Sequence, residues 1–147
     1  ADADERAIRA LLSNPRLMLP LDEITAPPGL SRAAGEVESI DSVPDDEMIL
    51  DDGPKTVDAL GKIATGAKTI LWNGPLGNYE KGFTDGTEGL AKAIAGSDAY
   101  SILGGGDTVA AVEKLGLSDR FSFISTGGGA MLDFLAKGTL PGLRALQ

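Results

Sequence analysis

Five short apolar runs punctuate the sequence, and each is bounded by Gly, Pro or Asp, as β-strands are. The runs are RLMLPL (16–21), DEMILDD (46–52), KTILWNG (68–74), YSILGGG (100–106) and RFSFIST (120–126). Amphipathic segments that predict helices follow the last four runs, at 54–66, 86–95, 108–116 and 129–137. Strands alternating with helices of about ten residues predict βα units and a parallel sheet with helices on both faces.

The stretch 23–45 interrupts this alternation because it is irregular and rich in Pro and Gly. It contains one short candidate strand at GEVESI (35–40). We expect an ordered excursion rather than a linker between domains, since 147 residues suit one domain with a real core. The predicted fold class is α/β, with a three-layer, Rossmann-like architecture.

Composition narrows the chemistry that such a domain can perform. The chain contains neither Cys nor His. The lack of Cys excludes disulfides, thiol nucleophiles and Cys-based zinc sites, and it fits a reducing cytoplasm. The lack of His removes the commonest general base and the commonest transition-metal ligand. Chemistry must therefore come from carboxylates, Lys, Arg, hydroxyls, backbone N–H groups and a hard metal such as Mg²⁺.

The formal net charge of −9 restricts the partners. It argues against nucleic acid and against an anionic membrane, although it could also serve solubility alone. It disfavours long-range attraction of a phosphorylated ligand, so phosphate binding would have to be local. No run approaches the roughly 18 apolar residues that span a bilayer, and the charged start is unlike a signal peptide. These features predict a cytoplasmic location.

Three of the apolar runs end in glycine-bearing loops: WNGPLGNYE (72–80), GGGDT (104–108) and STGGGA (125–130). In an open parallel sheet the carboxyl ends of the strands share one edge, where ligands bind. Glycines allow backbone N–H groups to approach a ligand, and the following helix adds its partial positive end. The two triplets therefore predict phosphate cradles that need no basic side chain. They match neither a P-loop, since no GK[ST] occurs, nor a GxGxxG fingerprint, whose last position is Val109.

Each candidate residue also has a purely structural interpretation. Asp107 suits a helix N-cap, and it could also hold a Mg²⁺ that carries nucleotide phosphates. WNGPLG could be only a tight turn, or it could place Asn73 on a phosphate oxygen and Pro75 against a base. Glu80 could be a solvated carboxylate or an acceptor for ribose hydroxyls.

Five ordered motifs resemble the C-terminal, nucleotide-binding domain of the phosphoglycerate kinase family. They are ILWNGPLGNYE (70–80), GTEGLAKAIA (86–95), SILGGGDTVAAVEKLGLSDR (101–120), ISTGGGAMLDFL (124–135) and LPGLRAL (140–146). The resemblance covers essentially the whole chain, and it implies that residues 1–147 are a partial domain of that kind. It also implies the family's glycolytic reaction, the reversible transfer of a phosphoryl group between 1,3-bisphosphoglycerate and Mg-ADP that gives 3-phosphoglycerate and ATP.

The resemblance further implies roles for individual positions. The nucleotide-binding positions would be Leu50, Asn73, Pro75, Asn78, Glu80, Gly105, Gly106, Asp107 and Thr108, with Asp107 on magnesium. Thr126, Gly127 and Gly128 would meet the transferring phosphoryl group through backbone N–H groups. Phosphoryl transfer requires positioning and charge neutralisation rather than a His base, which agrees with the composition.

The chain also departs from the family's pattern. The family's N-terminal domain, which holds the phosphoglycerate, its GGAK-type lysine motif and its GGGM-type adenine loop have no counterpart in residues 1–147. Asn78 stands where the family has an apolar residue, and Asp52 where it has an apolar residue or Cys. We therefore expect this chain to be inactive alone, marginally stable, and dependent on a complementing or swapped chain. The alternatives are a non-catalytic nucleotide-binding or interaction module and a purely structural domain.

Overall fold

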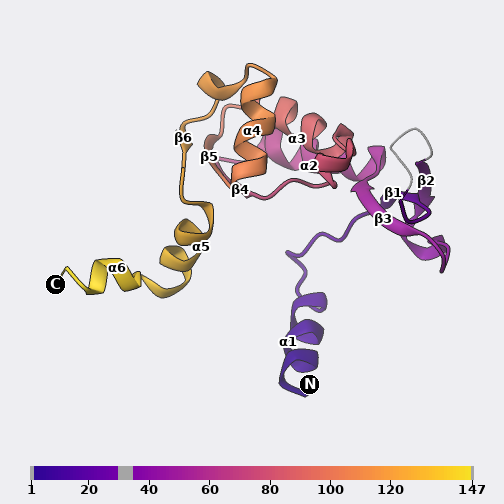
Figure 1. Ribbon diagram of the computed structural model, residues 1–147, viewed down its shortest axis with the longest axis horizontal. Helices are drawn as coiled ribbons and strands as arrows, with labels where there is room; N and C mark the ends of the chain where they lie inside the picture. The colour runs from indigo at the N-terminus through magenta and orange to yellow at the C-terminus, as the bar shows by residue number, and fades with distance from the viewer. Residues whose placement is uncertain (1, 30–34, 147) are drawn as a thin grey trace.

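The computed structural model describes residues 2–29 and 35–146, which form two three-stranded sheets and the helices between and around them (Figure 1). The elements are α1 (Asp2–Leu12), β1 (Asp22–Ala26), β2 (Glu36–Ser39), β3 (Met48–Asp52), α2 (Pro54–Gly66), β4 (Thr69–Asn73), α3 (Asp85–Ala95), β5 (Tyr100–Gly104), α4 (Gly106–Lys114), β6 (Phe123–Ile124), α5 (Gly128–Lys137) and α6 (Pro141–Arg144). Short 3₁₀ helices lie at η2 (Ile40–Ser42), η3 (Tyr79–Lys81) and η4 (Ser118–Arg120). The helices predicted at 54–66, 86–95, 108–116 and 129–137 are confirmed as α2 to α5.

The parallel sheet has the strand order β4-β5-β6. One face carries the cross-strand row Trp72–Leu103–Ile124, on which α2, α3 and α4 pack. The helices contribute Ala64, Leu90, Ala91, Ile94, Ala95 and Val112 to this core. Helix α5 lies against the opposite face, where the Met131 side chain reaches Gly104. The predicted α/β fold with helices on both faces of a Rossmann-like sheet is therefore confirmed.

Within residues 2–29 and 35–146, the second face of this sheet is covered only at its carboxyl end. It carries the row Leu71–Ile102–Phe123, whose outer members, Leu71 and Phe123, are 45% and 53% exposed. Tyr100 on the same face is 56% exposed. Successive side chains of a strand point to opposite faces of the sheet, so a parallel strand that is buried on both faces has apolar residues on both. Both cross-strand rows of this sheet are apolar. The described residues therefore leave Leu71 and Phe123 of this apolar row exposed.

The second sheet is antiparallel, with strand order β2-β1-β3. The prediction that run 46–52 joins the parallel sheet was wrong, because β3 pairs with β1 instead. The prediction of a strand at 16–21 was also wrong, since the strand begins at Asp22. Pro15 precedes that run and Pro20 lies within it, and both lack the N–H group that ladder pairing requires. Of the two pairing partners of β1, β2 lies in the irregular stretch 23–45 and β3 lies in the run 46–52.

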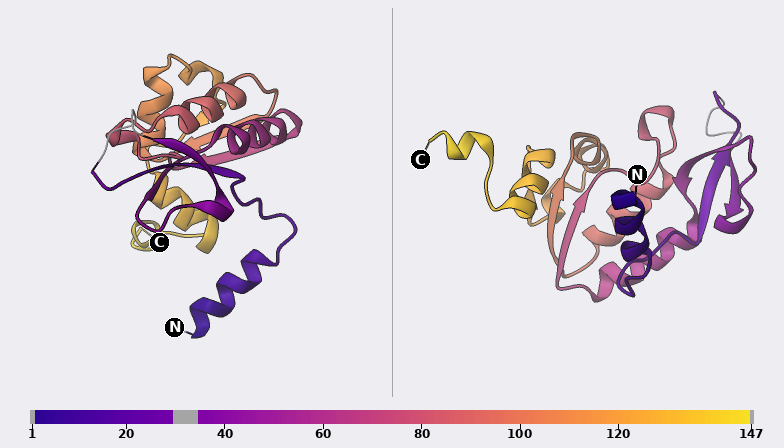
Figure 2. Two further views of the ribbon diagram at one scale, coloured as in Figure 1. Left: turned by 90° about the vertical axis from the view of Figure 1, so that its right-hand side faces the viewer. Right: turned by 90° about the horizontal axis from the view of Figure 1, so that it is seen from below.

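That stretch contains β2, which confirms the short strand predicted at 35–40, whereas residues 30–34 of the predicted excursion lie outside the described residues. Helix α1 was not predicted, and it projects away from both sheets, as Figure 1 and the left-hand view of Figure 2 show. Ile8, Leu11 and Leu12 have helical spacing, yet all are more than half exposed. Within the described ranges no helix is long and apolar enough to cross a membrane.

Candidate functional site

Three loops meet where the parallel strands end. The side-chain amide of Asn73, the last residue of β4, donates a hydrogen bond of 3.0 Å to the carbonyl of Gly128 at the start of α5. The N–H of Gly74 donates to the Thr108 hydroxyl of α4, also at 3.0 Å. The loops after β4, β5 and β6 are thus tied to one another at a single edge of the sheet, the position at which such sheets bind ligands.

The backbones of the two glycine triplets pack closely against each other. A Cβ atom on Gly128 would fall on the backbone nitrogen of Gly105. Gly105 has φ +89°, a conformation that L side chains rarely adopt. A Cβ on Gly104 would meet the Met131 side chain. Close packing of two helix N-termini therefore requires glycine at these positions, whether or not a ligand binds there.

These two helix N-termini, at α4 and α5, are open. Within residues 2–29 and 35–146, the N–H groups of Gly106, Asp107 and Thr108 in α4 have no hydrogen-bond acceptor. The same holds in α5 for the N–H groups of Gly128, Gly129 and Ala130. Unpaired N–H groups and the helix dipole together favour an anion at such a position.

The N-terminus of α2 is closed by a carboxylate instead. Asp22 of β1 accepts the N–H of Lys55 at 3.0 Å and the N–H of Thr56 at 2.8 Å. A Cβ on Gly53 would overlap this carboxylate. Burial raises the pKa of Asp22, but the hydrogen bonds from Lys55 and Thr56 outweigh burial and hold the pKa below its usual value. The charge that an anionic ligand would bring is already present at α2.

The N-terminus of α3 is closed in the same manner. Asp51 of β3 accepts the N–H of Gly86 at 3.0 Å, and its side chain is 2% exposed. Burial raises the pKa of this carboxyl, and the N–H groups of Gly86 and Asp52 offset only part of that rise. Of the four helices that follow strands β3 to β6, two are thus capped by a buried aspartate and two are left open.

A buried threonine occupies the third position of three of these helices. Thr56, Thr87 and Thr108 are at most 2% exposed. The hydroxyl of each accepts backbone N–H groups from a preceding strand or loop: Leu21 and Asp22 for Thr56, Leu76 for Thr87, and Gly74 for Thr108. Thr108 is also one of the predicted phosphate-binding residues: its hydroxyl accepts the Gly74 N–H, and its own O–H remains a donor.

The other predicted site residues divide into two groups. Gly105, Gly106, Asp107, Thr126, Gly127 and Gly128 surround the two open helix N-termini, with Asn73 between them. Leu50, Pro75, Asn78 and Glu80 belong to β3 and to the loop after β4, where the N–H of Asn78 donates to the Leu50 carbonyl at 2.7 Å. Glu80 is exposed in η3, and no described hydrogen bond or ion pair joins it to the glycine loops.

Asp107 is the one carboxylate in the first turn of the two open helices, and its side chain is exposed. Among the described residues no group of three His, Cys, Asp or Glu side chains could hold a metal ion by itself. Mg²⁺ in nucleotide sites is commonly held by one or two carboxylates together with phosphate oxygens and water. Asp107 could supply the carboxylate oxygen of such a site, and the free N–H groups beside it could bind the phosphates that supply the other oxygens.

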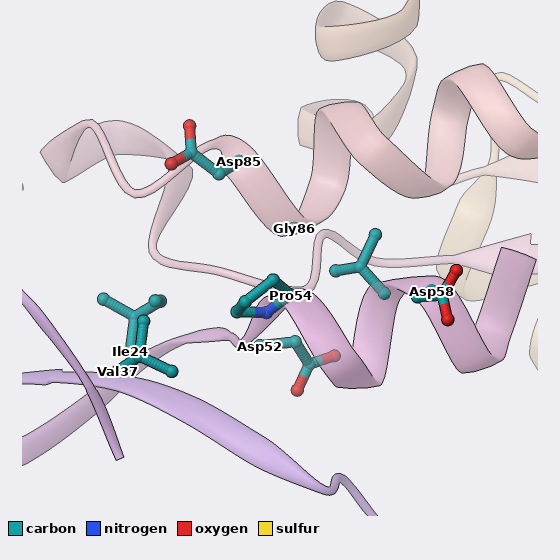
Figure 3. A pocket seen from close by; sticks show the side chains of 8 residues that line it. Ile24, Val37, Asp52, Pro54, Asp58, Asp85 and Gly86 are labelled. Atoms are coloured by element: carbon teal, nitrogen blue, oxygen red, sulfur yellow. The ribbon is translucent and has the colours of Figure 1, made fainter.

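A hollow of about 380 Å³ lies elsewhere, between the antiparallel sheet and the helices α2 and α3 (Figure 3). Its lining includes the carboxyl groups of Asp52, Asp58 and Asp85 beside the apolar side chains of Ile24 and Val37. Burial, followed by the charge of Asp22, raises the pKa of Asp52. Carboxylates repel phosphate groups, so this hollow is not a competing anion site.

The fold and the sheet edge define an α/β protein of the Rossmann-like class. The sequence model of the phosphoglycerate kinase family matches residues 3–138, and this chain belongs to that family. It is 51% identical to a phosphoglycerate kinase of Solibacter usitatus (strain Ellin6076) over 133 residues, which are 90% of this chain and 34% of that protein.

Two solved structures are similar. The phosphoglycerate kinase from Coxiella burnetii matches with a TM-score of 0.83 and 45% identity over 97% of this chain and 37% of its own. That from Pyrococcus horikoshii OT3 matches with a TM-score of 0.81 and 35% identity over 99% of this chain and 36% of its own. The chain thus spans about a third of the length of these relatives.

Proposed function

We propose that this chain provides the Mg-nucleotide half of a phosphoglycerate kinase active site, for reversible phosphoryl transfer between 1,3-bisphosphoglycerate and Mg-ADP in glycolysis in the cytoplasm. The observation that carries the proposal is the contrast among the helix N-termini. Carboxylates close α2 and α3, whereas α4 and α5 present unpaired N–H groups that lie together around Asn73. Two adjacent anion positions suit a reaction in which one phosphoryl group moves between two phosphate-bearing partners.

Each candidate residue has a task in this proposal. The residues Gly105 to Thr108 bind the nucleotide phosphates through the open N–H groups of α4, and the N–H groups at Thr126–Gly128 meet the transferring group. Asp107 holds Mg²⁺, which when bound neutralises the charge of the phosphate oxygens. Glu80 accepts the ribose hydroxyls, and the remaining positions, Leu50, Pro75 and Asn78, line the base. Asn73 holds the two helix N-termini together and faces the phosphates.

The same proposal limits what these 147 residues do alone. The three glycine-bearing loops at this edge, residues 72–80, 104–108 and 125–130, contain no Lys or Arg that could bind the phosphoglycerate. We expect the isolated chain to bind Mg-nucleotide without turnover, the phosphoglycerate being held by parts that the longer relatives have. Formation of ATP from 1,3-bisphosphoglycerate and Mg-ADP by this chain would contradict that expectation.

Calorimetric titration of ADP tests the proposal directly. We expect the wild-type chain to bind ADP more tightly with Mg²⁺ than without it, and Asp107→Asn to weaken the Mg²⁺-dependent affinity by about tenfold. Asp119→Asn, at an exposed aspartate in η4, is the matched control and should bind like wild type. Absence of binding, or equal affinity with and without Mg²⁺, would overturn the proposal.

A further inference from the structure

A carboxylate outside the candidate ligand contacts lies beneath the loop that carries several of them. Asp51, at the end of β3, is buried against residues of the loop after β4 and against the first turn of α3. A Cβ on Gly77 or on Gly86 would overlap its carboxyl group. One carboxylate oxygen accepts the N–H of Gly86 and the other accepts the N–H of Asp52, each at 3.0 Å. Asp51 thus occupies the space between the loop and the helix.

Neighbouring residues hold the same part of the loop. The Leu50 carbonyl accepts the N–H of Asn78 at 2.7 Å, and the Thr87 hydroxyl accepts the N–H of Leu76 at 3.0 Å. Three consecutive residues, 76 to 78, are therefore fixed by β3 or by α3, with Asp51 against the middle one. Glu80 follows two residues later, in the turn η3.

We propose that Asp51 is a positioning residue for nucleotide binding, which sets the place of the loop 74–80, and hence of Glu80, relative to the open helix N-termini. This inference rests on the proposed function. A buried carboxylate is tolerated only where N–H groups satisfy it, so the two hydrogen bonds fix where Asp51 can lie. Since Gly77 packs on Asp51 without a side chain between them, the backbone of the loop follows the position of this carboxylate.

Asp22 provides a matched comparison within the same chain. It also caps a helix, is 1% exposed, and packs against a glycine, Gly53, that has no room for a Cβ. Its hydrogen bonds lead to α2, and none of those described reaches the loop 74–80. Loss of either aspartate removes the cap of one helix, but only Asp51 lies against the loop 74–80.

The test compares Asp51→Asn with Asp22→Asn in the 147-residue chain, by calorimetric titration with Mg-ADP below the melting temperature of both variants. We expect both variants to lower the melting temperature, and only Asp51→Asn to weaken Mg-ADP binding, by about tenfold. Wild-type affinity in Asp51→Asn, or an equal loss in Asp22→Asn, would overturn the inference. Failure of the wild-type chain to bind Mg-ADP would instead overturn the proposed function, and this inference with it.

A second pair keeps the test decisive if Asp51→Asn does not fold. Gly77→Ala leaves the carboxylate in place but forces the loop away from it, and we expect a similar loss of affinity. Gly53→Ala creates the corresponding overlap with Asp22 and should keep wild-type affinity. Equal binding by the two glycine variants would contradict a positioning role for the contact between Asp51 and the loop.

Discussion

The side-chain amide of Asn73 bonds to the carbonyl of Gly128 at 3.0 Å, joining residues 55 positions apart in the sequence. Asn73 ends β4 and Gly128 begins α5, so the bond passes beside the end of β5, where Gly105 lies. This arrangement leaves no space for a side chain at the contact between the two glycine triplets. The triplets therefore have a packing role in addition to any role at a ligand.

Gly128→Ala and Gly129→Ala separate packing from helix propensity, because the two residues are neighbours in the first turn of α5. A Cβ at Gly128 would meet the backbone of Gly105, whereas nothing lies within 4 Å of a Cβ at Gly129. We expect Gly128→Ala to lower the free energy of unfolding by about 1–3 kcal/mol. Gly129→Ala should be neutral or stabilising by up to about 1 kcal/mol. Urea unfolding measures both, and equal effects would contradict the close approach of the triplets.

Thr108→Val tests the buried threonines. The substitution keeps the shape of the side chain but removes the acceptor for the Gly74 N–H. An unsatisfied N–H next to a fully buried side chain should cost about 1–3 kcal/mol of unfolding free energy. Thr108→Ser retains the hydroxyl and should lose less stability in the same unfolding experiment. A smaller loss in the Val variant than in the Ser variant would show that the hydrogen bond is not what matters at this position.

The pH dependence of stability should depend on Glu23. This residue lies directly between Glu38 and Asp52 in the antiparallel sheet and is 4% exposed. Burial, followed by the charges of Asp52, Asp22 and Asp51, raises the pKa of Glu23 from 4.5 to about 7. The folded chain therefore keeps a proton that the unfolded chain releases near pH 4.5.

It follows that the contribution of Glu23 to stability is fully present below pH 4.5 and is lost as the pH rises through about 7. We expect the unfolding free energy of the wild type, relative to Glu23→Gln, to fall by about 1.4 kcal/mol per pH unit across that interval. Denaturant unfolding at pH 4.5, 5.5, 6.5 and 7.5 measures this difference. Glu36→Gln, on the neighbouring strand, is the control, and parallel curves for wild type and Glu23→Gln would refute the assignment.

The uncovered row of the parallel sheet should promote association. Leu71 and Phe123 present apolar surface on a face that α5 covers only in part, and such surface favours a partner. We expect the wild-type chain to self-associate in sedimentation velocity and Phe123→Thr to shift it toward monomer, because Thr keeps strand propensity while removing apolar area. A strictly monomeric wild type with a cooperative thermal transition would contradict the expected dependence on a complementing chain.

Local pattern was sufficient to predict the parallel βα units and the loop edge. Trp72, Leu103 and Ile124 lie in apolar runs that end in glycine-bearing loops, and a parallel sheet requires those ends to share one edge. The caps could not be predicted in this way. Asp22 and Asp51 reach helices 33 and 35 residues away, through pairings of an antiparallel sheet whose register has no local signal. The threonine at the third position of α2, α3 and α4 was a signal in the sequence that was overlooked.

In the proposed function, α4 and α5 bind phosphate because their N-termini are open, whereas buried carboxylates close the N-termini of α2 and α3. Backbone amide chemical shifts recorded during a titration with Mg-ADP test it most directly. We predict shifts at Gly105, Gly106, Asp107 and Thr108, with the N–H groups of Lys55, Thr56 and Gly86, which donate to carboxylates, unchanged. Chemical-shift changes at the capped amides, with none at the glycine triplets, would show that the open helix N-termini do not bind the nucleotide.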